Sequence, residues 1–194
     1  QEAIDMGRRR PEKHPASVSA LLKLVAGDNP VAAEVGVFRG QTSAVLLRDH
    51  PTLFLYMIDP WAPFSHDGTY AATGDYMALQ DQATCDANYA EAMRVTEFAY
   101  ARRIVKRLTS ELVAPHISDG GLDLAFIDAE HSYEACQYDI SLWWPKIKPG
   151  GILCGHDYSR KVYPGVVQAV NEAAVRLRVQ LQFAAGWVWW FKKD

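Results

Sequence analysis

The sequence lacks three features that mark large classes of proteins: a long apolar run, a framework of cysteines and an excess of one charge. No apolar run approaches the roughly 20 residues that span a bilayer, and only three cysteines occur among 194 residues. Three widely spaced cysteines form no disulfide framework and are typical of reduced thiols in a core. These absences predict a cytoplasmic protein with no membrane partner.

The balance of charge also excludes a class of partner. The formal net charge is -3 at pH 7 and the sequence pI is near 6.1, which does not favour binding to nucleic acid. A small molecule fits better as the partner, and a homo-oligomer is left open. With 49% hydrophobic residues, the chain is long enough for one domain with a sizeable core.

We therefore expect a single domain over residues 1–194, with two appendages. Residues 1–30 are predicted to form an N-terminal helical cap. Residues 62–80 show neither helical nor strand periodicity, and a loop of that length in a compact domain is usually a lid or a binding loop. We predict a lid-like insertion there.

Short apolar runs alternate with amphipathic segments along the rest of the chain. Strands are predicted at residues 31–35, 53–58, 103–108, 122–127 and 152–154, and their lack of a polar face is typical of strands covered on both sides by helices. Apolar residues then alternate on either side of Gly186, as in an antiparallel hairpin. The pattern predicts an α/β fold with an open, mostly parallel sheet.

Acidic residues and histidines follow two of these strands. Asp128 closes the strand at 122–127, and His131 follows in the loop before Ser132, a predicted helix N-cap. His156 and Asp157 follow the strand at 152–154. Because ligands bind beyond the carboxyl ends of parallel strands, we expect these side chains to surround one pocket.

A second candidate site is the turn after the first strand, in VAAEVGVFRGQTSAVLL. Gly36 would let the chain leave the strand tightly, and Gly40 would let backbone approach a ligand or the sheet. Asp59 follows Gly40 by 19 residues, where a nucleoside-binding sheet holds ribose hydroxyls. Glu34 needs a partner if it is buried: a ligand ammonium, backbone amides or an arginine. The glycine spacing alone fits a plain turn equally well.

Together these features resemble the class I S-adenosylmethionine-dependent methyltransferases, from about residue 31 to the end of the chain. The segment FIDAEHSYEACQYDISLWWPKIKPGGILCGHDY is similar to the subfamily that includes the macrocin and cephamycin-type O-methyltransferases. The resemblance implies a Rossmann-like, seven-stranded sheet with helices on both faces and a C-terminal antiparallel hairpin. It also implies methyl transfer to a hydroxyl of a small molecule, such as a sugar or another natural product.

The resemblance assigns roles to individual residues. It implies that S-adenosylmethionine is bound by Glu34, Gly36, Gly40, Asp59, Ser110 and Asp128. Within this set Glu34 and the glycine turn meet the methionine part, Asp59 the ribose, and Ser110 the adenine. A helix cap is the commoner role for a serine in such a position and is the alternative for Ser110.

The catalytic and metal roles fall on the two strand ends. His131 matches a general base, suited to removing a hydroxyl proton near neutral pH, and Asp128 would hold it or the acceptor. Asp128 and Asp157 match two acidic ligands of magnesium or another divalent metal, with His156 where antibiotic-type members carry an acid. The plainer interpretation makes His131 a loop residue and Asp128 a hydrogen-bonded strand end.

Two other functions are carried as alternatives. An NAD(P)-binding Rossmann-type oxidoreductase also places its cofactor over a glycine turn, but this turn lacks the Gly-x-Gly-x-x-Gly spacing. The other alternative is a non-catalytic domain that binds S-adenosylmethionine, favoured only by His156 in place of an acid.

Overall fold

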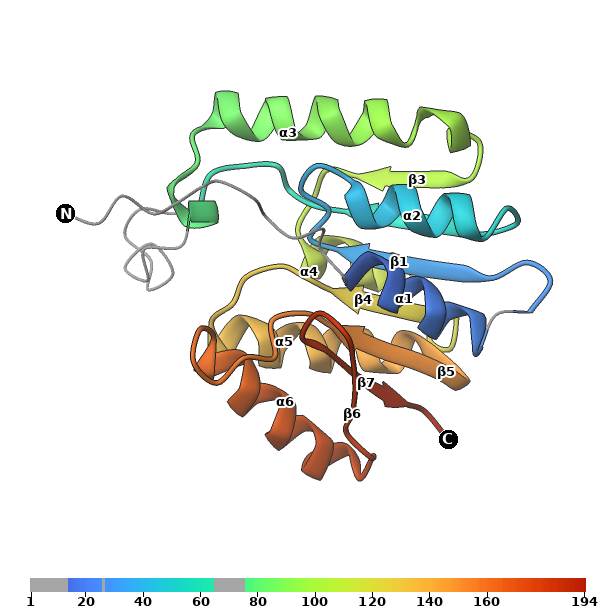
Figure 1. The fold of residues 1–194 in the computed structure, drawn as a ribbon, viewed down its shortest axis with the longest axis vertical. Coiled ribbons are helices and arrows are strands. Elements are labelled where there is room, and N and C mark those ends of the chain that lie inside the picture. The colour runs from blue at the N-terminus through green and yellow to red at the C-terminus, as the bar shows by residue number, and fades with distance from the viewer. Residues whose placement is uncertain (1–13, 26, 65–75) are drawn as a thin grey trace.

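The computed structural model describes residues 14–25, 27–64 and 76–194 (Figure 1). The predicted N-terminal cap falls within it only from His14 onward, as helix α1 (His14–Lys23). Most of the predicted lid, residues 65–75, lies outside the described residues. Next to it the chain forms a short 3-10 helix, η2 (Tyr76–Leu79).

A seven-stranded sheet forms the centre of the molecule, in the order β3-β2-β1-β4-β5-β7-β6. Strands β1 to β5 are parallel, and β7 pairs antiparallel with both β5 and β6. This confirms the predicted sheet and its terminal hairpin. The strands are β1 (Val31–Val35), β2 (Phe54–Ile58), β3 (Arg103–Lys106), β4 (Leu122–Ile127), β5 (Ile147–Gly155), β6 (Gln182–Ala184) and β7 (Val188–Lys192).

Helices cover both faces of this sheet (Figure 1). On one face, α1, α2 (Gln41–Asp49) and α3 (Gln82–Val95) pack against one apolar cluster. On the other, α4 (Ser110–Val113), α5 (Tyr133–Trp143) and α6 (Pro164–Leu177) pack against a second. Three further 3-10 helices are η3 (Glu97–Ala99), η4 (Ala114–His116) and η5 (Trp144–Lys146).

Strand β4 shows why the apolar runs carry no polar face. Leu124 and Phe126 belong to the cluster beneath α1 to α3, whereas Ala125 and Ile127 belong to the cluster beneath α4 to α6. Because side chains alternate across a strand, a sheet covered on both sides favours apolar residues on both faces of its strands. At the helix that follows, Ser132 Oγ accepts from Ala135 N at 3.2 Å, as predicted for an N-cap.

The strands depart from prediction at β5 and β6. Strand β5 begins at Ile147, five residues before the predicted start, because Ile147 already pairs with Leu122 before the register shifts between Leu122 and Leu124. Gly150, at φ 79, also donates its amide to Lys193 O. Strand β6 keeps only residues 182–184 of the predicted alternation.

The apolar character of the helices and the state of the cysteines can both be seen in the structure. Among the described residues, no helix is long and apolar enough to cross a bilayer. Cys85, Cys136 and Cys154 are all free and buried, as predicted for core thiols.

Gly36 follows β1 and lies against Asp128, the residue that follows β4. Its φ is 86°, and a Cβ at this position would lie 2.0 Å from the carbonyl oxygen of Asp128. Gly120 has a similar φ of 65°, but a Cβ there would meet nothing within 4 Å. The two glycines therefore share a backbone conformation and differ in the space around them.

We expect Gly36→Ala to lower the free energy of unfolding by about 3 kcal/mol or more, because the left-handed backbone and the collision both oppose a side chain. Gly120→Ala, the control, should cost only about 1 to 2 kcal/mol. Denaturant unfolding of both variants measures the difference. Equal losses would show that the contact with Asp128 is not tight.

Candidate active site

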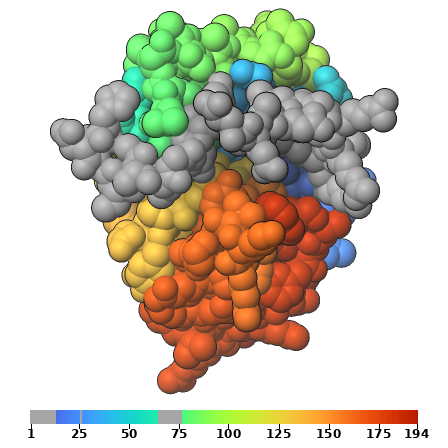
Figure 2. All heavy atoms as spheres, turned by 60° about the vertical axis from the view of Figure 1, so that its left-hand side comes forward, coloured from blue at the N-terminus to red at the C-terminus, as the bar shows by residue number. Residues whose placement is uncertain are grey.

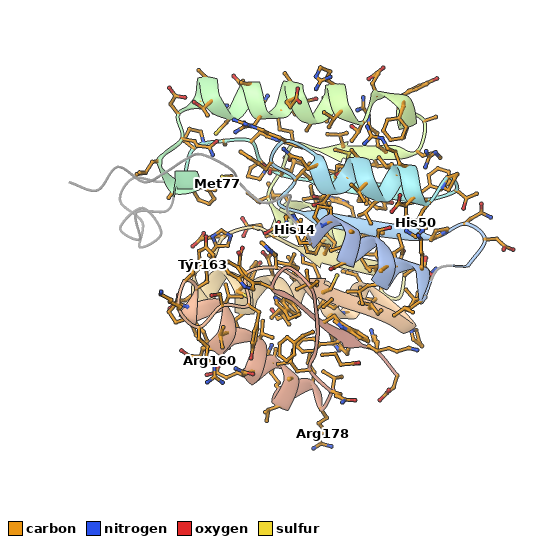
Figure 3. The ribbon with its side chains drawn as sticks, viewed as in Figure 1. His14, His50, Met77, Arg160, Tyr163 and Arg178 are labelled. Carbon is orange, nitrogen blue, oxygen red and sulfur yellow. The ribbon has the colours of Figure 1, made fainter. Side chains whose placement is uncertain are left out.

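The predicted site residues lie where the parallel strands end. Figure 3 shows Tyr163 at the left of the molecule, on the same side as Met77, whereas His50 lies at the right. Figure 2 turns this left side toward the reader, with α3 in green above and the β4 to α5 region in yellow and orange below.

Two carboxylates and three imidazoles form the centre of the site. Asp128 Oδ1 lies 3.3 Å from His156 Nδ1, and Asp128 Oδ2 lies 3.8 Å from His14 Nε2. Asp157 Oδ1 lies 3.2 Å from His156 Nδ1, and Asp157 Oδ2 lies 2.8 Å from His131 Nε2. The prediction that Asp128, His131, His156 and Asp157 gather around one place is therefore correct.

The ionisation of this cluster follows from its hydrogen bonds. Burial alone would lower the pKa of His156, but hydrogen bonds and charge attraction from Asp128 and Asp157 outweigh burial and raise that pKa to about 10. For Asp157, burial alone would raise the pKa, but hydrogen bonds from His131 and His156 hold it well below its usual range. An imidazolium at position 156 and a carboxylate at position 157 thus stabilise each other.

Asp128 is predicted to hold either His131 or the acceptor, and the carboxylate that pairs with His131 is instead that of Asp157. His131 Nε2 lies 2.8 Å from Asp157 Oδ2, so Asp157 rather than Asp128 orients the ring. The backbone of Asp157 is left-handed, with a φ of 62°. The ring of Tyr163 also packs on His131, with centroids 4.4 Å apart.

A small pocket opens among these groups. Asp128, His131, His156 and Asp157 line its polar side, and Cys136 and Trp189 are among the residues on its apolar side. Polar groups that converge over an apolar wall are typical of a small-molecule site. The pocket has a free volume of about 10 Å³, which is room for one water-sized group.

Asp59 closes the turn that follows β1. Its Oδ2 accepts hydrogen bonds from Val37 N at 3.0 Å and Phe38 N at 2.9 Å, and its Oδ1 accepts from Trp61 N at 2.7 Å. Burial raises the pKa of Asp59, and these backbone bonds oppose that rise. Trp61 Nε1 donates to Phe38 O at 2.8 Å, so the turn is fixed from two sides. The ribose role of Asp59 stays a prediction.

Glu34 is almost fully buried, at 2% exposure, and its partner lies in the first turn of α2. Ser43 Oγ donates to Glu34 Oε2, so the alternative of an arginine partner is wrong. Burial raises the pKa of Glu34 well above its usual value, and the nearby charges of Asp128 and Asp59 raise it further. Three acids therefore lie within electrostatic reach of one another.

The remaining predicted cofactor residues pack within the fold. A Cβ at Gly40, whose φ is 76°, would lie 3.0 Å from the Cα of Ala92 in α3, so this glycine permits helix packing. Ser110 is the first residue of α4 and makes no cap. It accepts from Trp143 Nε1 at 3.3 Å and bonds to Asp139. Its role near an adenine stays a prediction.

The predicted metal ligands do not fit magnesium. Magnesium demands oxygen ligands in near-octahedral geometry, whereas all four oxygens of Asp128 and Asp157 face imidazole nitrogens. Among the described residues, the donor atoms that lie within 4.8 Å of one another come from Asp128, His131 and Asp157. His156 is a hydrogen-bond partner of the two carboxylates rather than the third ligand of that group.

Sequence reasoning missed His14. Its ring lies 4.3 Å from that of His156, between centroids, and stacks on Phe126 of β4. Only the packing of α1 across the sheet brings it there, and no local pattern around His14 signals a site. Its presence makes the predicted helical cap part of the site.

The fold and the site together define a methyltransferase of class I architecture. A family model described as a methyltransferase domain matches residues 33–158, which contain the glycine turn and both strand ends. The chain belongs to this family, which confirms the class predicted from the sequence. A search of curated proteins finds no significant match.

Solved structures share the fold at low sequence identity. The O-methyltransferase NovP superposes with a TM-score of 0.71 at 16% identity, over 94% of this chain and 80% of NovP. The calicheamicin methyltransferase CalS11 gives 0.65 at 17% identity, over 95% and 80%. A protein from Corynebacterium glutamicum gives 0.66 at 13% identity, over 97% and 83%.

The cluster makes stability depend on pH in a defined direction. The pKa of an unfolded histidine is about 6.5, and in the folded protein that of His156 is raised to about 10. The stabilisation from His156 is therefore complete below the unfolded value and is lost as the pH rises toward 10. For Asp157, whose pKa is lowered, stabilisation is instead lost as the pH falls below about 4.

We expect the melting temperature of the native protein to exceed that of His156→Asn most clearly between about pH 4 and 6.5, and the difference to shrink as the pH rises toward 10. Thermal unfolding monitored by circular dichroism across this range measures it. His116→Asn, at an exposed position, serves as the control and should differ from native by a constant amount. A difference in melting temperature between the native protein and His156→Asn that widens as the pH rises would contradict the raised pKa of His156.

Proposed function

We propose that the protein transfers a methyl group from S-adenosylmethionine to a hydroxyl of a small molecule. One observation carries the proposal: a histidine oriented by a carboxylate lies beside Asp128, and Asp128 in turn lies near the acids of the glycine turn. The family supplies the reaction class, and these residues supply the means to bind a cationic cofactor and to remove a proton.

The charges around the glycine turn favour S-adenosylmethionine over NAD(P). Asp128 and Asp59 impose a negative potential at Glu34, where their charges help to raise its pKa, and such a potential suits a ligand that carries ammonium and sulfonium groups. A dinucleotide would instead need free backbone amides for its pyrophosphate. Here the amides of Val37 and Phe38 already donate to Asp59, so the oxidoreductase alternative is disfavoured.

The residues at the strand ends would prepare the acceptor hydroxyl. When bound, S-adenosylmethionine supplies a methyl group that is already activated. With Nε2–H of His131 donated to Asp157, the other ring nitrogen, Nδ1, is the basic one in the neutral tautomer. His131 can then accept the hydroxyl proton while Asp157 stabilises the resulting imidazolium. Such a pair is superfluous in a domain that only binds the cofactor.

Rings beside the base suit an acceptor that itself contains a ring. Tyr163 packs on His131, and Trp187, which is 53% exposed, lies 6.4 Å from His156 between ring centroids. CalS11 is described as a TDP-rhamnose 3'-O-methyltransferase. A sugar or another ring-bearing natural product is accordingly the acceptor class we propose. A cytoplasmic location and a homo-oligomeric state stay predictions.

Asp59 gives a test of cofactor binding. We expect Asp59→Ala to weaken binding of S-adenosylhomocysteine by about 1 to 3 kcal/mol in calorimetry, because ribose hydroxyls would lose an acceptor. An analogue that lacks both ribose hydroxyls is the control, since it should bind the native protein and the variant with similar affinity. If the variant loses both ligands equally, Asp59 acts only through the turn.

His131 gives a test of the chemistry. General base catalysis typically contributes about 100-fold to 10,000-fold, so His131→Ala should lower turnover on a hydroxyl acceptor by that order while cofactor affinity stays near native. His116→Ala, far from the strand ends, is the control and should keep native turnover. Near-native turnover of His131→Ala would remove the base from the mechanism, and joint loss of cofactor binding and turnover would mark a structural histidine.

A further inference from the structure

His156 lies between the two carboxylates of the site. Its Nδ1 is 3.3 Å from Asp128 Oδ1 and 3.2 Å from Asp157 Oδ1, so one N–H group bridges side chains from the ends of β4 and β5. The same two carboxylates are the acidic ligands expected of a metal site. The N–H group of His156 thus makes a contact between the two carboxylates that a bound cation could otherwise make.

The surrounding structure fixes the His156 ring in that position. His156 N donates to Ile127 O at 3.0 Å, and His156 O accepts from Trp189 Nε1 at 3.1 Å. The ring of His14 lies against it at 4.3 Å between centroids. Because backbone and ring are both held, the ring cannot swing aside easily to admit an ion.

The outer oxygen of Asp157 is hydrogen-bonded as well, and that of Asp128 lies near a third imidazole. Asp157 Oδ2 pairs with His131 Nε2 at 2.8 Å, and Asp128 Oδ2 lies 3.8 Å from His14 Nε2. A metal ion placed between Oδ1 of Asp128 and Oδ1 of Asp157 would have to displace the bridging N–H of His156. Hydrogen bonds to charged groups are worth more than neutral ones, so this displacement is costly.

We propose that His156 replaces a divalent cation between Asp128 and Asp157, so that the site is assembled by imidazole groups and operates without a bound metal ion. The inference rests on the proposed function for its catalytic consequence. With no Lewis acid at the acceptor hydroxyl, removal of its proton depends on His131. The geometric part of the inference concerns metal binding alone.

The test is a gain of magnesium binding. His156→Asp removes the bridging ring and supplies a third carboxylate, the kind of ligand that magnesium prefers. We expect magnesium chloride to raise the melting temperature of His156→Asp by several degrees and to give a one-site calorimetric isotherm. The native protein should show neither response, nor bind manganese or zinc with one-to-one stoichiometry.

Two control variants separate the site from a general effect of charge. His116→Asp adds the same charge at an exposed position and should not respond to magnesium. The double variant His156→Asp with Asp128→Asn should lose the gained response. Circular dichroism establishes that each variant is folded before titration.

Stoichiometric binding of any of the three ions to the native protein, abolished by Asp128→Asn, would overturn the inference. A folded His156→Asp that gains no magnesium binding would also overturn it. If His156→Asp fails to fold, the titration of the native protein with the three ions still tests the inference. Failure of the proposed function would be seen separately, as absence of S-adenosylmethionine binding, because the metal titrations need neither cofactor nor acceptor.

Discussion

The gathering of four acidic side chains at the carboxyl ends of β1, β2, β4 and β5 is the constraint on which the site depends. Like charges in a partly buried region destabilise the fold unless each is compensated. Glu34 is compensated by the start of α2 through Ser43, and Asp59 by three backbone amides. Asp128 and Asp157 are compensated by imidazoles. The loops after these strands are shaped by that need.

Much of the fold could be predicted because apolar periodicity reports directly on burial. Strands β1 and β4 begin and end where their apolar runs do, and α5 begins directly after the predicted cap Ser132. The prediction failed where strand pairing rather than local composition sets the end of a strand. Ile147, for example, belongs to β5 because it pairs with Leu122. Such a boundary depends on a neighbouring strand, and a local pattern cannot contain it.

The site, like the fold, contains features that could be predicted from the sequence and features that could not. That Asp128 and Asp157 meet follows from two neighbouring parallel strands that both end in acids. That Asp157 pairs with His131 could not be read from the sequence, nor could the left-handed φ of 62° at Asp157, a conformation that residues other than glycine seldom adopt. The position of His14 in the site depends on how α1 packs across the sheet. The residue types could be predicted, whereas their partners required coordinates.

The glycine turn illustrates the limit of a spacing motif. Gly36 is explained by the approach of the Asp128 carbonyl, and Gly40 by its contact with Ala92, so neither position by itself requires a ligand. Evidence about the cofactor comes instead from the amides of Val37 and Phe38, which are engaged by Asp59. The hydrogen bonds of the turn, more than its glycines, discriminate a cationic cofactor from a dinucleotide.

The imidazoles of the site divide their work between structure and chemistry. His156 bridges Asp128 and Asp157 and so fixes the carboxylate that in turn orients His131. A base must release and accept its proton during turnover, whereas a bridging group must keep its proton, so one histidine could not serve both purposes. The pKa of His156, raised to about 10, suits the bridging role and is far too high for a base near neutral pH. A histidine in place of an acid is therefore compatible with the proposed chemistry, because it compensates the carboxylates and leaves the proposed role of base to His131.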